Sequence, residues 1–83
     1  MKISIDTETF LIKGRNVPPL VCVSYAEQTW GEWRSGVKRG EDAREYVRDA
    51  LQNHTVIMQN ASFDLSVICR AWPSMIPLVF QAL

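Results

Sequence analysis

The sequence predicts a mixed α/β fold: a three-stranded meander followed by a helix, a strand and a second helix. Three observations predict it. Apolar residues alternate over residues 2–6, β-branched and aromatic residues dominate 20–26, and a helical apolar stripe over 41–52 precedes another apolar run at 55–59. Because one strand-helix-strand unit follows the meander, we expect a mixed sheet with a right-handed crossover.

The first half of the chain contains the meander. Residues 2–6 (Lys-Ile-Ser-Ile-Asp) alternate as a strand does, and residues 11–19, with Gly14 and the Pro18-Pro19 pair, predict a loop. Residues 20–26 predict a well-buried strand. We expect residues 28–35 to form a shorter edge strand, with Trp30 and Trp33 partly packed.

The second half contains the helices. Residues 36–40 form a basic segment that we interpret as a turn, and the helix at 41–52 carries acids in its first turn, where the helix dipole favours them. A strand at 55–59 and a helix at 62–72 follow, and Pro73 ends that helix. The apolar tail, 74–83, fits no element.

The composition of the chain limits the classes of protein to which it can belong. The 83 residues form one small domain, 1–83, with 47% apolar and 22% charged residues, as expected of a folded chain. Nine basic and nine acidic residues cancel, which argues against a protein that binds DNA by net charge alone. Cys22 and Cys69 lack metal-site spacing and predict free thiols in a reducing compartment. We find no membrane span or signal peptide and expect a cytoplasmic protein without a membrane partner.

Three carboxylates follow predicted strands. Asp6 and Glu8 lie two residues apart, so a continuing strand projects both from one face, and Asp64 begins a helix after a different strand. If the two strands are neighbours, these acids share a crevice at the sheet edge, where they can hold hard divalent cations. The alternatives are solvated turn residues for Asp6 and Glu8 and a dipole-stabilising acid for Asp64. Asn60 and Ser62 are, equally, suitable helix caps.

Two segments together resemble a known family. Ile-Ser-Ile-Asp-Thr-Glu-Thr at 3–9 and Gln-Asn-Ala-Ser-Phe-Asp at 59–64 are similar to the first two motifs of the DEDD 3′–5′ exonucleases, which have an RNase H-like fold. The nearest subgroup is the proofreading domain of family A DNA polymerases, found in bacteria and phages. Residues 20–26 resemble the second strand of that family, and the resemblance covers 1 to about 72.

The resemblance implies a partial RNase H-like fold and a site for two divalent cations, Mg²⁺ or Mn²⁺. Asp6 would bridge both metals, Glu8 would bind the water-activating one and Asp64 the other. Thr7, Asn60 and Phe63 would contact the substrate or support the site. The implied partners are the 3′ end of single-stranded DNA and a polymerase domain.

The family's third motif, Tyr-x-x-x-Asp or His-x-x-x-x-Asp, is absent, because no Asp, Glu, His or Tyr follows Asp64. His54, Tyr25 and Tyr46 precede the second motif. We therefore expect an incomplete exonuclease-like domain that is weakly active or inactive by itself, and a second polypeptide that supplies the missing half.

Other interpretations remain open. The first is a non-catalytic module derived from the same half-fold, which binds a protein, or itself, through its open edge and apolar tail. The second is a nuclease of another RNase H-like branch, which the second motif disfavours. Trp30 and Trp33 could stack on bases, although packing on an edge strand is the simpler interpretation. The basic residues either meet phosphates or form a solvated face with ion pairs: Arg34, Lys38, Arg39, Arg44 and Arg48.

Overall fold

The computed structural model describes residues 1–10, 17 and 19–82, so the predicted loop at 11–19 lies mostly outside the described residues. In chain order the elements are β1 (Lys2–Thr9), β2 (Leu20–Thr29), β3 (Glu32–Lys38), α1 (Gly40–Asn53), β4 (Thr55–Ile57), α2 (Ala61–Ala71), the 3₁₀ turn η1 (Pro73–Met75) and α3 (Ile76–Ala82).

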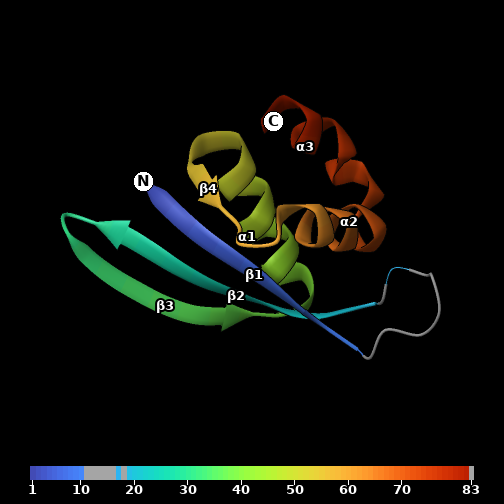
Figure 1. Ribbon diagram of the computed structural model, residues 1–83, viewed down its shortest axis with the longest axis horizontal. Coiled ribbons are helices and arrows are strands. Elements are labelled where there is room, and N and C mark those ends of the chain that lie inside the picture. The colour runs from blue at the N-terminus through green and yellow to red at the C-terminus, as the bar shows by residue number, and fades with distance from the viewer. Residues whose placement is uncertain (11–16, 18, 83) are drawn as a thin grey trace.

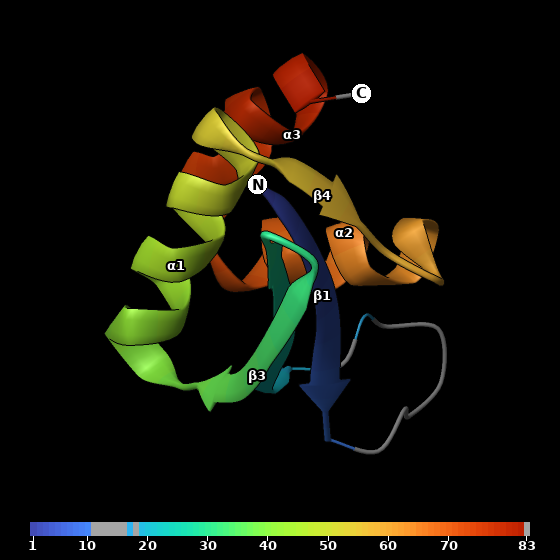
Figure 2. The ribbon, with the colours of Figure 1, turned by 90° about the vertical axis from the view of Figure 1, so that its left-hand side faces the viewer.

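The strands form one mixed four-stranded sheet in the order β3-β2-β1-β4. The pairs β1–β2 and β2–β3 are antiparallel, and β4 lies parallel to β1, with Ile3 opposite Val56. The helices gather on one side of this sheet (Figures 1 and 2). The predicted α/β class and the mixed sheet are therefore confirmed.

The core lies between the helices and one face of the sheet. Alternation along β1 sends Ile3, Ile5 and Thr7 toward the helices, where all three side chains are buried. The core cluster adds one residue of β2, three of α1, one of α2 and one of η1: Val23, Ala43, Val47, Ala50, Ile68 and Met75. Because the described helices all pack against this face (Figures 1 and 2), the sheet is buried on one face only.

The other sheet face, which we call the open face, is uncovered by any described element. It carries the alternate residues of each strand, as the register requires: Lys2, Ser4, Asp6, Glu8, Cys22, Ser24, Ala26, Gln28, Trp33, Ser35, Val37, Thr55 and Ile57. Its apolar members on the outer strands are half exposed, with Trp33 at 53% and Val37 at 52%. A mixed polar and apolar surface is therefore left to solvent.

The hairpin differs from the prediction. The turn consists of Trp30 and Gly31, whose φ angles are 54° and 81°, and β3 runs on through Lys38. Gly36 is a strand residue paired with Tyr25 and is not part of a turn. Its lack of a side chain makes room for the Tyr25 hydroxyl, which lies 2.6 Å from where a Cβ would be. The expected packing of Trp30 is also wrong: at the tip of the turn, it is 98% exposed.

The helices match the prediction closely. The expected helix at 41–52 is α1, and that at 62–72 is α2, each displaced by one residue at its ends. The strand predicted at 55–59 is shorter, since β4 ends at Ile57. The unassigned tail forms η1 and α3, which bury Met75 and Val79 and leave Phe80 72% exposed. In the part of the chain that the structure describes, no helix is long and apolar enough to cross a membrane.

Candidate functional site

The parallel pairing of β1 and β4 brings the two motif segments together. β4 pairs only with the first part of β1, so β1 continues past it to Thr9 while the chain turns into α2. Asp64, on the first turn of α2, thereby comes beside Thr7. The Asp-x-Glu segment and the Asn60–Asp64 segment are therefore neighbours in space.

Asp64 lies on the helix side of β1 and is 3% exposed. Its Oδ1 accepts a hydrogen bond from the Thr7 hydroxyl at 2.6 Å and another from the Thr7 backbone N–H at 3.3 Å. A buried carboxylate needs such donors, because desolvation is otherwise costly. These two hydrogen bonds connect the first turn of α2 to Thr7 of β1.

Asp6 and Glu8 lie on the open face, as the alternation predicts, and both are exposed. Glu8 accepts hydrogen bonds on both oxygens, from the Ser24 hydroxyl at 3.2 Å and from the Cys22 thiol at 3.6 Å. Burial raises the pKa of the Cys22 thiol, and the charge of Glu8 raises that pKa further. Cys22 thus remains a protonated donor to this carboxylate.

A shallow hollow of about 220 Å³ adjoins Asp6. Ser4, Ile5, Asp6 and Gln59 line it, so it sits where the chain leaves β4 beside β1. Three of these four residues carry a side-chain oxygen: a hydroxyl, a carboxylate and an amide. Oxygen ligands of this kind suit Mg²⁺ and Mn²⁺.

The described side chains do not bring the three predicted carboxylates into one cluster: no group of three or more His, Cys, Asp or Glu is close enough to hold a metal among them. Asp6 and Glu8 are exposed on the open face, whereas Asp64 is buried and bonded to Thr7, whose side chain faces the helices. Asp6 and Glu8 remain a suitable pair for one hard cation, since Mg²⁺ is commonly held by one or two carboxylates, waters and substrate phosphates.

The predicted substrate-contacting residues lie around this region. Thr7 is buried and bonded to Asp64, so its side chain faces the helices. Asn60 is exposed at the N-cap of α2, where its side chain makes no capping hydrogen bond. Phe63 is half-buried on the first turn of α2.

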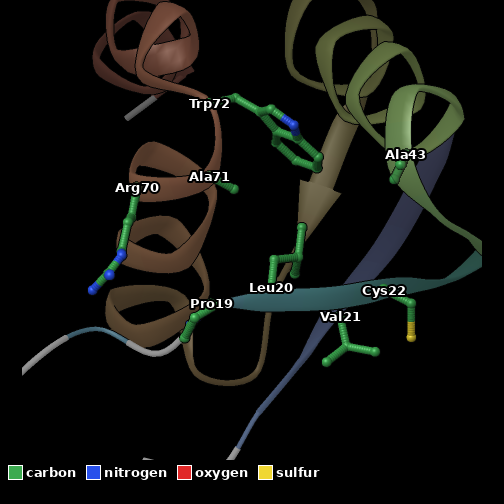
Figure 3. A pocket seen from close by; sticks show the side chains of 9 residues that line it. Pro19, Leu20, Val21, Cys22, Ala43, Arg70, Ala71 and Trp72 are labelled. Atoms are coloured by element: carbon green, nitrogen blue, oxygen red, sulfur yellow. The ribbon is translucent and has the colours of Figure 1, made fainter.

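A larger hollow, of about 350 Å³, lies elsewhere, between β2 and the helices (Figure 3). Leu20 and Trp72 point into the space between the strand and the helices, whereas Val21 and Cys22 point to the other side of β2. Among the described residues that line this hollow there is no carboxylate. Its lining is mostly apolar, and Arg70 is the charged residue in it.

Sequence reasoning missed three polar residues near the carboxylates. Ser24 and Cys22 hydrogen-bond Glu8, and Gln59 shares the hollow with Asp6. The strand register contains the signal for two of them: in an antiparallel pair, directly opposite residues share a face. Once Glu8 is placed opposite Cys22, Ser24 follows two residues along β2 on the same side.

Comparison with known proteins gives no match: no protein family model, curated protein or solved structure is significantly similar to this chain.

Proposed function

We propose that this chain is the part of a metal-dependent 3′–5′ exonuclease domain, of partial RNase H-like fold, that carries the first two carboxylate motifs. The observation that carries the proposal is the parallel pairing of β1 and β4, which makes the two motif segments neighbours and bonds Asp64 to Thr7. These carboxylates lie near the ends of adjacent parallel strands, which is where open α/β sheets bind ligands.

In this proposal Asp6 and Glu8 would hold one divalent cation, and Asp64, which is bonded to Thr7, would be the protein ligand of a second. Such cations would supply an activated water and neutralise the leaving oxygen of a phosphodiester. Gln59, which shares the hollow with Asp6, and the exposed Asn60 beside it in the sequence would contact the terminal nucleotide of single-stranded DNA. Because no third motif follows Asp64, we expect weak hydrolysis by the chain alone.

Metal binding tests the site directly. Calorimetric titration with Mn²⁺ should detect weak binding, and Asp6→Asn or Glu8→Gln should weaken it by about tenfold or more, which is about 1.4 kcal/mol. Asp42→Asn is the matched control, because this carboxylate is exposed on the first turn of α1, away from β1. Equal Mn²⁺ binding by all four proteins would contradict the proposal.

The nuclease activity is tested with a single-stranded DNA labelled at its 5′ end. With Mn²⁺, the chain should shorten this DNA slowly or not at all from the 3′ end, and a polypeptide with the third motif should increase the rate on mixing. Fast shortening by the chain alone, abolished by Asp6→Ala, would mean that the site is complete without that motif.

A second candidate function is a non-catalytic module that binds a protein. The exposed apolar residues of α3 favour it, since Phe80 is 72% and Ile76 40% exposed. In that case Mn²⁺ binding would not depend on Asp6 or Glu8. Light scattering would show an oligomer that Phe80→Ser dissociates.

A further inference from the structure

β3 forms one edge of the sheet. It pairs with β2 on its inner side, and no described strand pairs with its outer side. Thr29 and Glu32 flank the two-residue turn of Trp30 and Gly31 and are paired with each other. In a turn of this length the two flanking residues are a hydrogen-bonded backbone pair. Bonded positions alternate along an antiparallel strand, so Glu32 and every second residue after it bond to β2. The backbone N–H and C=O groups of Trp33, Ser35 and Val37 consequently point outward, unpaired.

The sequence of β3 is complementary to itself about Ser35. An antiparallel second copy centred there places Ser35 opposite Ser35, Trp33 opposite Val37 and Glu32 opposite Lys38. Every outward N–H and C=O group of the three residues then has a partner. On the open face, two half-exposed apolar side chains meet, and on the other face two opposite charges meet.

Neighbouring registers lack this complementarity. A displacement by two residues in one direction puts Arg34 opposite Arg34, and in the other direction it puts Arg34 opposite Lys38. Like charges directly opposite each other destabilise a strand pair. In the register centred on Ser35, Arg34 faces Gly36 of the second copy, and no like charges are directly opposed.

We propose that two copies of this chain associate through β3, in antiparallel register centred on Ser35, to form one continuous eight-stranded sheet. A two-fold axis requires a self-complementary surface, which the charge pattern and the apolar pair of β3 provide. Edge-to-edge pairing also satisfies a row of backbone groups that an exposed edge leaves open. This proposal goes beyond the exonuclease proposal and does not depend on it.

Charge exchange tests the register. Sedimentation equilibrium should show the wild-type mass rising with concentration toward twice the 9.5 kDa of one chain. Glu32→Lys alone and Lys38→Glu alone oppose like charges at both ends of the pair, and each should raise the dimer dissociation constant by about tenfold. An equimolar mixture of the two variants restores both opposite-charge pairs and should associate as the wild type does.

The controls separate association from folding. Glu45→Lys makes the same charge change on the exposed side of α1 and should leave the dimer intact. Lys38 lies 5.7 Å from the Tyr25 ring centre, so circular dichroism must show that Lys38→Glu folds. Ser35→Pro removes an outward N–H without removing a donor to β2, and once circular dichroism shows that it folds, it should abolish association independently of charge. A monomeric wild type, or a mixture no more associated than its components, would overturn the proposal.

Discussion

At the residue scale, Thr7 separates two kinds of carboxylate. Its neighbours Asp6 and Glu8 face solvent on the open face, while Thr7 itself turns inward and donates to Asp64. One position along a strand thus decides whether an oxygen faces solvent or the core. Asp64 is held by side-chain and backbone donors of the same residue, which makes Thr7 the connection between the two motifs.

Thr7→Val removes the hydroxyl donor while keeping the size of the side chain. It leaves the buried Asp64 carboxylate with only the longer backbone hydrogen bond, and the free energy of unfolding should fall by about 2 kcal/mol. Urea denaturation measures the change. Thr55→Val, at an exposed position of β4, is the control and should change stability by less than about 0.5 kcal/mol. Equal losses in both variants would show that the hydrogen bond contributes nothing specific.

At the element scale, the β2–β3 hairpin has an unusual turn. Positive φ at both turn residues is the pattern of a type I′ turn, which favours Asn-Gly, yet Trp30 occupies the first position. Its side chain is 98% exposed and gains little from packing. The turn therefore follows from strand pairing on both sides of it, not from the preference of its first residue.

Trp30→Asn should stabilise the protein by about 0.5–1 kcal/mol, because Asn tolerates positive φ and little burial is lost. Trp30→Val should destabilise it by about 1 kcal/mol, since a β-branched residue fits this conformation poorly. Thermal unfolding of the two variants and the wild type checks the order. Similar melting temperatures for Asn and Val at this position would contradict it.

Prediction from sequence succeeded where the signals are local. The apolar stripe and first-turn acids located α1, and Pro73 located the end of α2. The end of β3 was expected at residue 35 because Gly36 looks like a turn residue, whereas β3 continues through Gly36, whose lack of a side chain makes room for Tyr25. The hairpin turn at Trp30 and Gly31 was missed because both residues lie inside the strand expected at 28–35. Alternation correctly put Asp6 and Glu8 on one face. The burial of Asp64 depends on how α2 packs behind β1, which no local pattern contains.

At the scale of the whole molecule, there are two layers: the sheet, and the helices that cover one face of it. Two tyrosines help to join the layers: the rings of Tyr25 and Tyr46 lie 4.5 Å apart, and the Tyr46 hydroxyl donates to Glu27. Burial raises the pKa of Tyr46, and the hydrogen bond to Glu27 and its charge raise it further. The hydrogen bond from Tyr46 to Glu27 thus favours the protonated phenol.

Stability should consequently fall in alkali. The pKa values of Tyr46 and Cys22 are higher in the folded chain than their ordinary values of 10.0 and 9.0. Their contribution is complete below the ordinary values and is lost as the pH rises toward the folded ones. Urea denaturation between about pH 8 and pH 11 should show this loss. In Tyr46→Phe the free energy of unfolding should fall less steeply with pH. If the free energy of unfolding of that variant depends on pH as the wild type's does, Tyr46 does not contribute to the loss of stability in alkali.

The hydrogen bond between Thr7 and Asp64 joins residues 57 positions apart, whereas the β2–β3 hairpin joins near neighbours. Closing a long loop costs more chain entropy than closing a short one, so local contacts form first. We therefore expect the meander to assemble with Asp6 and Glu8 already placed, and Asp64 to reach Thr7 only after α1 and β4 have packed against it. On this expectation the exposed carboxylates and the buried one enter the structure at different stages of folding.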